Sequence, residues 1–455
     1  MSPNSEVLHL GDHQTYASSM MDSVPQLGLY FEMRTGKTMC VLDWAYWSAL
    51  RGDLKSLLIT CPAQLVDNWS RAIDKMLQFD NGYTEEGINL LKSITHISSF
   101  QKLYHIKKTP IKHRDGNVET KMTHPLREEV DQYWDAMVVD EAHQIGNHSS
   151  QNCKTCLLLS KLAKRRYILT GTPFSGGGGA EDFQKLYGQL KFLDNSVWEN
   201  WTDFKNRYVL SFDHWGNPRK YRKDELMELV KKYAIVCRQS DIHDLPETTD
   251  DIIRCEFTER KAYKDFQNGN LAPYNMTVAN SGSIYTKLLQ LCNGDVITDD
   301  GVMKFKCGKD EALRTILSGT DDKVVIFCTH TAPIDRVYDI CKTFGKTAIY
   351  DGRSKDDPSL EFQNGDTKYL VAQYVCGSTG IDLFASHTMV FYEPTTSAVL
   401  LEQAKARIWK PYSDRKCGYY FLVSKGTMEE KVVQNVINGM DCPVTLLNEW
   451  AKESI

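Results

Sequence analysis

Short apolar runs separated by amphipathic stretches are the feature of this chain that most limits its fold. The apolar runs have the length of buried strands, and the stretches between them repeat apolar residues at helical spacing. Strands that alternate with helices predict parallel sheets, because a parallel pair needs a long crossover connection. The alternation occurs twice, so the sequence predicts two α/β domains, as a length of 455 residues also favours.

The expected elements fall into two halves. In the first half we expect strands at Leu27–Phe31, Leu57–Thr60, Ala136–Val139 and Tyr167–Leu169, and helices at Lys37–Leu50 and Gln64–Phe79. In the second half we expect strands at Val324–Cys328, Thr347–Tyr350, Tyr369–Ala372, Met389–Tyr392 and Tyr419–Val423, and helices at Ala332–Thr343 and Ala398–Trp409. We therefore predict one domain over residues 1–248, elaborated at about 196–248, and a linker with a second domain over residues 249–455.

Composition excludes several classes of protein. A net charge of −5 excludes a globally basic nucleic-acid coat, although a local basic groove is compatible with it. The apolar runs are too short to span a bilayer, and the first residues show no secretory pattern, so we expect an intracellular protein. The 13 cysteines suit buried thiols better than a disulfide framework, and Cys153–Cys156 lacks the second pair that a zinc site needs.

A phosphate-binding loop is indicated by Glu32–Thr38, which follows a predicted strand and precedes a predicted helix. Backbone N–H groups point toward an anion at such a helix start. Lys37 would reach the β- and γ-phosphates of ATP, and Thr38 would hold Mg²⁺. Phe31 stands where the usual pattern has its first glycine, so this loop is a shortened version.

Two carboxylates, Asp140 and Glu141, follow the predicted strand Ala136–Val139. A carboxylate at the carboxyl edge of a parallel sheet faces the nucleotide crevice. Asp140 would hold the Mg²⁺ shell, and Glu141 would orient and deprotonate the attacking water.

Three segments resemble motifs I, II and III of superfamily 2 helicases: GKT at Gly36–Thr38, DEAH at Asp140–His143 and TGTP at Thr170–Pro173. Others resemble the Swi/Snf-type branch, in its order, between about Leu10 and Val436: His13-Gln14, Asn147, Leu245-Pro246, Leu291–Asn293, Val324–Phe327, Gly377–Leu383, Gln403–Arg407 and Lys425–Glu430. The chain departs from the branch with Gly146 for lysine, Asp382 for asparagine and Lys410 for the second arginine of motif VI, and it lacks the His-Pro that follows Asn293 in the branch.

The resemblance implies two tandem RecA-like (P-loop NTPase) parallel-sheet domains with ATP in the cleft between them. It assigns further residues to nucleotide binding: Gln14, Arg34, Thr35, Gly36, Gly380 and Asp382. Gln403 and Arg407 would act from the second domain across the γ-phosphate. Either Arg407 takes the role of the arginine finger or Lys410 serves as a weaker one, since lysine lacks the bidentate fork.

The resemblance also implies contacts with the phosphate backbone of DNA, at Pro62, Gln64, Trp69, Thr329, Thr331 and Thr379. Trp69 could instead be part of the core. A DG turn within Ile111–Glu119 predicts a basic hairpin that carries Lys112 and Arg114. A second basic turn, with Trp215, Arg219 and Lys220, could stack on bases. Both segments could equally be solvated surface loops.

The function that these features indicate is an ATP-dependent DNA helicase or translocase. We expect a monomer that acts on double-stranded or branched DNA without sequence preference, in branch migration, fork remodelling, recombination or repair. The compact core is typical of proteins in the cytoplasm of bacteria or phage-infected cells. Two alternatives stay open: an RNA-dependent ATPase or RNA helicase, and a nucleotide-gated DNA clamp with little hydrolysis.

Overall fold

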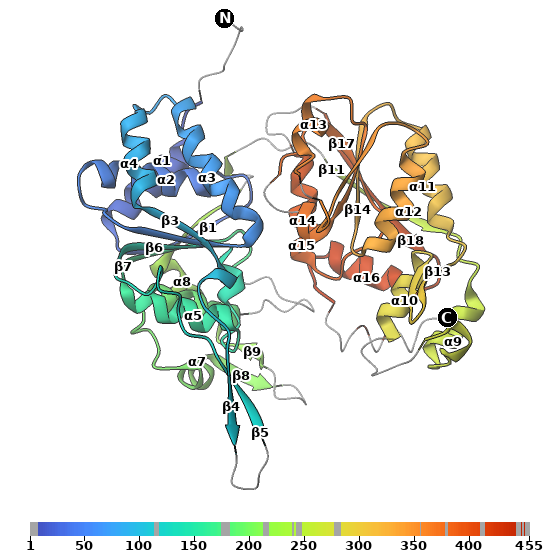
Figure 1. The fold of residues 1–455 in the computed structure, drawn as a ribbon, viewed down its shortest axis with the longest axis horizontal. Coiled ribbons are helices and arrows are strands. Elements are labelled where there is room, and N and C mark those ends of the chain that lie inside the picture. Colours follow the sequence, from blue (N-terminus) through green and yellow to red (C-terminus); the bar gives the residue numbers. More distant parts are fainter. Residues whose placement is uncertain are drawn as a thin grey trace, which may run out of the picture. The chain divides into compact units, whose positions relative to one another are not determined.

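The computed structural model describes residues 8–112, 118–173, 183–212, 218–238, 241–242, 248–276, 284–354, 356–377, 381–409 and 415–442, with Leu447 and Trp450. For residues 110–112, 118–121 and 218–219 it describes the backbone alone. The described residues form two compact units, one that ends at Ile242 and one that begins at Thr248 (Figure 1).

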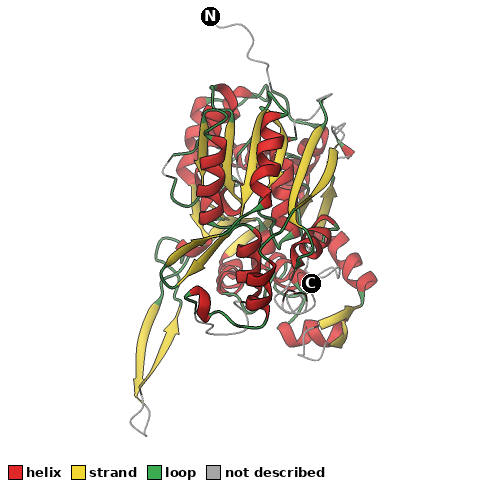
Figure 2. Cartoon of the chain, turned by 90° about the vertical axis from the view of Figure 1, so that its right-hand side faces the viewer, coloured by secondary structure: helices red, strands yellow, loops and turns green. Residues whose placement is uncertain are grey.

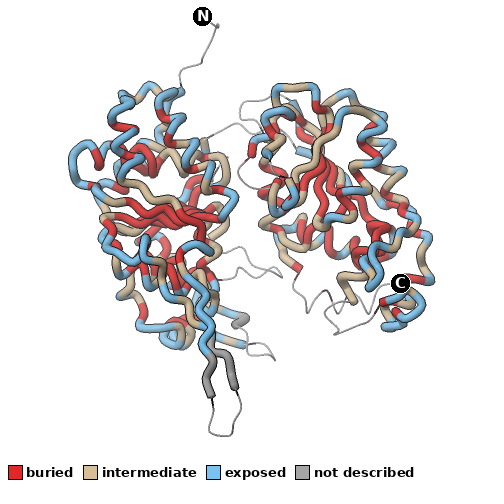
Figure 3. Tube along the Cα trace, viewed as in Figure 1, coloured by how far each residue is buried: buried red, intermediate tan, exposed pale blue. Residues whose placement is uncertain are grey.

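The first unit is built on a six-stranded sheet in the order β10-β1-β7-β6-β2-β3, and every pair in it is parallel. Its strands are β1 (Gln26–Phe31), β2 (Leu57–Cys61), β3 (Thr95–Ser99), β6 (Trp134–Asp140), β7 (Ala163–Leu169) and β10 (Ala234–Cys237). Successive side chains of a strand enter different cores, as Val138 and Val139 of β6 do. The inner strands are therefore buried on both faces over runs such as Tyr167–Leu169 of β7, which is why these runs are apolar (Figure 3).

Helices cover both faces of this sheet (Figure 1). One face carries α1 (Asp12–Ser23), α2 (Lys37–Leu50), α3 (Val66–Lys75) and α4 (Glu85–Ile94). The other carries α5 (Gln151–Leu159), α6 (Lys185–Leu193), α7 (Trp201–Tyr208) and α8 (Lys223–Tyr233). Short 3₁₀ turns connect these elements: η1 (Ala63–Leu65), η2 (Met76–Gln78), η3 (Phe100–Lys102), η4 (Ala142–Ile145) and η5 (Ser160–Leu162).

The second unit repeats the architecture with a parallel sheet in the order β11-β18-β17-β14-β16-β15. Its strands are β11 (Thr248–Cys255), β14 (Lys323–Cys328), β15 (Thr347–Tyr350), β16 (Tyr369–Gln373), β17 (Ser386–Phe391) and β18 (Cys417–Ser424). One core is shared with α9 (Arg260–Gln267), α10 (Ile284–Cys292), α13 (Ser359–Asn364), α14 (Tyr374–Gly377), α15 (Ala398–Lys405) and α16 (Met428–Ile437). The opposite core is shared with α11 (Gly308–Ser318) and α12 (Thr331–Cys341), and η7 (Ala272–Tyr274) and η9 (Ala406–Ile408) complete the unit.

The predicted fold class is confirmed, since both units are α/β with a parallel sheet. All nine predicted strands are found, and helix α2 has the predicted bounds. The sequence analysis did not identify β3, β10 and β11. All three are edge strands: polar residues interrupt the apolar run in β3 and β11, and β10 is a run of only four residues.

Three two-stranded antiparallel sheets lie outside the main sheets: β4 (Lys107–Lys112) with β5 (Val118–Thr123), β8 (Val209–Phe212) with β9 (Pro218–Tyr221), and β12 (Asp295–Thr298) with β13 (Gly301–Lys304). The first of these confirms the predicted hairpin, and it extends away from the body of its unit (Figure 2). In the second, strand β9 carries Arg219 and Lys220 of the predicted aromatic and basic turn, and Trp215 lies outside the described residues.

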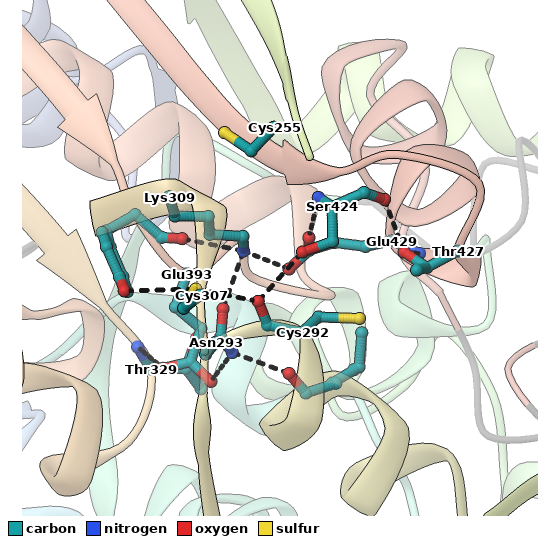
Figure 4. Close-up of polar contacts among 12 residues, drawn as sticks. Cys255, Cys292, Asn293, Cys307, Lys309, Thr329, Glu393, Ser424, Thr427 and Glu429 are labelled. Atoms are coloured by element: carbon teal, nitrogen blue, oxygen red, sulfur yellow. Dashed lines mark hydrogen bonds and ion pairs between the residues drawn. The ribbon is translucent and has the colours of Figure 1, made fainter. Parts of the chain in front are cut away.

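A buried ionic network lies inside the second unit (Figure 4). The Lys309 ammonium, which is fully buried, contacts the Glu429 carboxylate at 2.5 Å and the Asn293 side-chain oxygen at 2.7 Å. The other Glu429 oxygen accepts from the backbone N–H of Ser424 at 2.7 Å. Burial works against the charge on Lys309, but the Glu429 carboxylate holds the pKa of the lysine above its ordinary value. The network therefore ties α10, α11 and α16 to the sheet.

Replacing Lys309 with methionine should destabilise the second unit by about 3–5 kcal/mol, because the Glu429 carboxylate would stay buried without its cation. Urea unfolding of the full chain measures this loss. The matched control is Lys342→Met, since Lys342 pairs with Asp339 on an exposed helix face and should unfold like the wild type. Equal effects of the two substitutions would contradict the role of the buried pair.

Candidate nucleotide-binding site

The predicted nucleotide residues gather at the carboxyl ends of three neighbouring strands. Strands β1, β7 and β6 are adjacent in the sheet, and they are followed by Glu32–Lys37, Thr170–Pro173 and Glu141–His143. Because the strands are parallel, all three segments leave the sheet at the same edge. A Cβ atom placed on Gly171 would lie 3.3 Å from the carbonyl oxygen of Phe31, so the first two segments are in close contact.

The loop between β1 and α2 has the backbone of a tight anion-binding turn. Arg34 and Gly36 adopt left-handed conformations, with φ of 61° and 77°. The Thr35 hydroxyl donates to the Glu32 carbonyl at 2.8 Å, which closes the turn. The Lys37 ammonium donates to the carbonyls of Phe31 (2.8 Å) and Glu32 (3.1 Å), so its charge lies over the loop.

Helix α1 braces this loop through the predicted glutamine motif. The Gln14 side chain accepts from the backbone N–H of Gly11 at 2.8 Å and donates to the Gly36 carbonyl at 3.3 Å. A His13 ring nitrogen is 2.8 Å from the Thr35 carbonyl. A Cβ atom on Gly36 would lie 1.9 Å from the Gln14 amide nitrogen, so this position needs glycine both for its φ and for its space.

Asp140 is buried at the end of β6, and both of its oxygens accept hydrogen bonds. One accepts from the Trp69 indole N–H and the other from the backbone N–H of Glu141, both at 2.9 Å. Burial and the Glu141 charge raise the pKa of Asp140 to about 6, while Lys37 and Trp69 oppose this shift. Because the folded-state pKa is the higher one, Asp140 lowers stability as the pH rises from its ordinary value of 3.8 through about 6.

Glu141 is linked to the third segment through His143. Its carboxylate lies 3.3 Å from Nδ1 of His143, and the same nitrogen is 3.5 Å from the hydroxyls of Thr170 and Thr172. Glu141 itself has a left-handed backbone, with φ of 51°. For a residue other than glycine this conformation is strained, and such strain is typical of functional sites. The edge thus carries a second carboxylate beside the buried one, and its side chain is 15% exposed.

The residues at this edge fit a nucleotide and its metal. The loop supplies backbone N–H groups and a lysine for phosphate, and the donors Thr38 and Asp140 are the hard oxygens that Mg²⁺ prefers. Elsewhere, the buried Cys153 and Cys156 lie on α5, and burial raises the pKa of Cys153 to about 12. Within the described ranges, no cluster of three or more His, Cys, Asp or Glu side chains forms a metal site.

The predicted residues of motifs V and VI lie in the second unit. Gln403 is buried on α15, and Asp382 is exposed after the undescribed residues 378–380. The Arg407 guanidinium donates to the carbonyls of Gln403 (3.1 Å) and Ile381 (3.2 Å), so it joins motif VI to motif V. Gly380 and Lys410 lie outside the described residues.

Some of the residues predicted to contact DNA are buried, and others are exposed. Pro62 and Trp69 are buried, whereas Gln64 is exposed, and the contact of this segment with DNA stays a prediction. For Trp69 the alternative of a core residue is correct, because its indole holds Asp140.

Thr329 also turns inward, since its hydroxyl is buried and its backbone N–H donates to Glu393 at 2.8 Å. Neither its amide nor its hydroxyl therefore faces solvent, and a contact of Thr329 with DNA stays a prediction. Lys220 and Thr331 are exposed. Arg114, Trp215 and Thr379, and the side chains of Lys112 and Arg219, lie outside the description.

Sequence reasoning missed the residues that hold these segments in place. Lys309 and Glu393 carry no motif signal, yet they bind Asn293 and Glu429 of two segments that carried the resemblance. At Gly146, where the Swi/Snf branch has lysine, a Cβ atom would lie 2.7 Å from Cβ of Lys185. The close approach of α6 therefore accounts for this departure.

Comparison with known families identifies the chain. The SNF2-related domain matches residues 21–295, which is more than half of the chain. The chain belongs to the SNF2-related family. The helicase conserved C-terminal domain matches residues 308–411 of the second unit. The predicted membership of superfamily 2 and its Swi/Snf branch is therefore confirmed, and with it an ATPase core of that family.

Similar curated proteins include DNA repair and recombination protein RDH54 of Saccharomyces cerevisiae (strain AWRI1631), 23% identical over 85% of this chain and 45% of the relative. RAD54-like of Danio rerio is 23% identical over 89% and 61%, and DNA repair protein rhp54 of Schizosaccharomyces pombe is 24% identical over 89% and 53%. The chain thus spans about half the length of these relatives.

Among solved structures, the Sulfolobus solfataricus SWI2/SNF2 ATPase core in complex with dsDNA shares 20% identity, with coverage of 99% and 94% and a TM-score of 0.42. None of the helices that the structure describes has the length and apolar character needed to cross a lipid bilayer.

Trp69→Phe should destabilise the chain by about 1.5–3 kcal/mol well above the pKa of Asp140, because the ionised carboxylate loses a charged hydrogen bond. The loss should be smaller well below that pKa, where the carboxyl is protonated. Urea unfolding followed by circular dichroism at both pH values measures the difference. Trp44→Phe is the control, since the buried Trp44 indole N–H has no partner among the described residues. A loss that is the same at both pH values would refute the bond to Asp140.

Proposed function

We propose that this SNF2-related chain is an ATP-driven motor that moves along double-stranded or branched DNA. The observation that supports the ATPase most directly is the meeting of Lys37, Asp140 and Glu141 at one edge of a parallel sheet. The DNA substrate is supported by the relatives, whose names describe DNA repair and recombination. Because the chain spans only part of those relatives, their activities enter here as part of the proposal.

Each residue of the edge has a distinct task in hydrolysis. The loop N–H groups and Lys37 bind the β- and γ-phosphates, and the lysine exchanges its carbonyl partners for phosphate oxygens. Glu141 orients the attacking water and accepts its proton, because its carboxylate is partly exposed while that of Asp140 is buried. His143 contacts the Glu141 carboxylate and the hydroxyls of Thr170 and Thr172, so it links Glu141 to the third segment.

Mg²⁺, when bound by Thr38 and Asp140, would neutralise phosphate charge during the transfer. Asp140 is suited to hold such a shell because Trp69 and the Glu141 amide fix both of its oxygens. The second unit would complete the reaction with Gln403 and Arg407, as the resemblance implies. Arg407 can act in this way only together with motif V, since its guanidinium is tied to the Ile381 carbonyl.

The surface of the first unit offers basic groups for nucleic acid. Lys107 and Lys108 begin the hairpin β4–β5, and Lys220 lies on the hairpin β8–β9, all of them exposed. Side chains of this kind make sequence-independent phosphate contacts. We propose that these two hairpins, with Lys112, Arg114, Trp215 and Arg219, contact the DNA beside the motor core.

The proposal is tested by measuring ATP hydrolysis with duplex DNA, branched DNA, single strands and structured RNA. Duplex or branched DNA should stimulate the wild-type chain most. Glu141→Gln should still bind ATP but lose about 10²–10⁴-fold in rate, because the proton acceptor is gone. Lys37→Ala should lose nucleotide binding. Glu86→Gln, an exposed substitution on α4, is the control. Stimulation by RNA alone would favour an RNA-dependent ATPase, and DNA binding without turnover would favour a clamp.

Arg407→Ala should stop DNA-stimulated hydrolysis, whereas Lys410→Arg should keep or raise the rate, because arginine adds the bidentate fork. Phosphate release under saturating DNA measures both variants. Arg407→Ala also loses the bond to Ile381, so Arg407→Lys serves as a second variant that retains a charge. A native rate in Arg407→Ala would move the finger role to another residue.

A further inference from the structure

The topology of the second sheet marks a ligand position directly after Val324–Phe327, where the resemblance places DNA contacts at Thr329 and Thr331 and assigns no role to His330. From β14 the chain passes through α12 to β15 on one side, and from the neighbouring β17 it passes through α15 to β18 on the other. Ligands of open α/β sheets bind outside the carboxyl ends of the strands at such a switch point. Here that position is formed by Thr329 and His330 after β14 and by Glu393 after β17.

Glu393 is a buried carboxylate that organises this position (Figure 4). One oxygen accepts from the backbone N–H groups of Thr329 and His330, each at 2.8 Å. The other accepts from the Asn293 amide at 2.9 Å and lies 2.6 Å from Nδ1 of His330. The backbone amides of Thr329 and His330 are therefore already occupied by Glu393.

His330 is the group of this position that reaches solvent. The His330 side chain is 34% exposed, whereas that of Glu393 is 3% exposed. No partner of the His330 Nε2 atom is found among the described residues. Nδ1 faces inward to the carboxylate, so the ring presents its other nitrogen outward.

The charges of the buried network favour a cationic His330. Lys309 is the cation of the network, and it shares the interior with the two carboxylates Glu429 and Glu393. A proton on His330 supplies a second positive charge at 2.6 Å from Glu393. Two groups facing the ring affect its titration: the hydrogen bond and charge of Glu393 raise the pKa of His330 above 6.5, and burial and the Lys287 ammonium on α10 oppose this.

We propose that protonated His330 binds a phosphate of the DNA strand, with Glu393 as its positioning residue. The affinity for DNA therefore falls as His330 loses its proton. The inference rests on the proposed function, which supplies the DNA. The inference assigns the expected contact with the DNA backbone to His330 instead of the neighbouring Thr329. The Thr329 hydroxyl faces inward, whereas the His330 cation faces outward. The ligand chemistry is an anionic phosphate oxygen, and a nucleotide phosphate is the competing source.

The test is duplex DNA binding by the full chain without nucleotide, followed by fluorescence anisotropy between about pH 5.5 and pH 8.5. Wild-type affinity should be constant at the acid end and fall up to about tenfold per pH unit above the pKa of His330. His330→Gln should bind roughly tenfold more weakly at the acid end and lose this fall. His330→Arg carries a permanent charge and should bind DNA almost independently of pH.

Controls separate this role from a structural one. His96→Gln changes a half-buried histidine on β3 of the first unit and should keep the wild-type pH profile. A wild-type profile in either His330 variant would overturn the inference, and His330→Arg serves if His330→Gln does not fold. ATP binding is measured in a parallel experiment without DNA. If the pH of the solution changes ATP affinity but not DNA affinity, His330 binds a nucleotide phosphate, and the inference is overturned. Failure of the wild type to bind duplex DNA at any pH would overturn the proposed function as well.

Discussion

Parallel strand pairing is the constraint on which the rest of this structure depends. Each crossover returns the chain to the same end of its sheet, so segments far apart in sequence leave at one common edge. At that edge the loop before α2, the DEAH segment and the TGTP segment come into contact, and the same rule places His330 beside Glu393 in the second unit. The chemistry of both units is thus a consequence of sheet topology.

Each unit sets a buried carboxylate at a strand end and surrounds it with donors. Asp140 is held by Trp69 and a backbone amide, and Glu393 is held by Asn293, His330 and two backbone amides. A buried carboxylate is costly unless it is hydrogen-bonded, so these donors are needed for the fold itself. This need explains why Trp69 and Thr329, which resemble DNA-contact residues, point inward.

The buried Lys309 ammonium holds together two of the segments that carried the family resemblance. Asn293 belongs to the segment Leu291–Asn293, and Glu429 belongs to Lys425–Glu430, and both bind the same buried ammonium. An ion pair inside a protein contributes little net stability against an apolar substitute, but loss of one partner is expensive. The pair therefore fixes the register of α11 and α16 against the sheet, and it leaves the outward groups of the unit to bind ligands.

The sequence by itself determined the α/β class, nine of the twelve strands of the two main sheets, helix α2, the hairpin β4–β5 and the family, because apolar periodicity and short motifs are local patterns. It also placed Lys37, Asp140 and Glu141 at strand ends. Only the tertiary structure decided that β3, β10 and β11 complete the sheets, that Trp69 supports Asp140, and that Lys309 and Glu393 join distant segments. Such contacts depend on which residues face each other after folding, and a buried lysine or glutamate looks like any surface charge until its partner is brought to it.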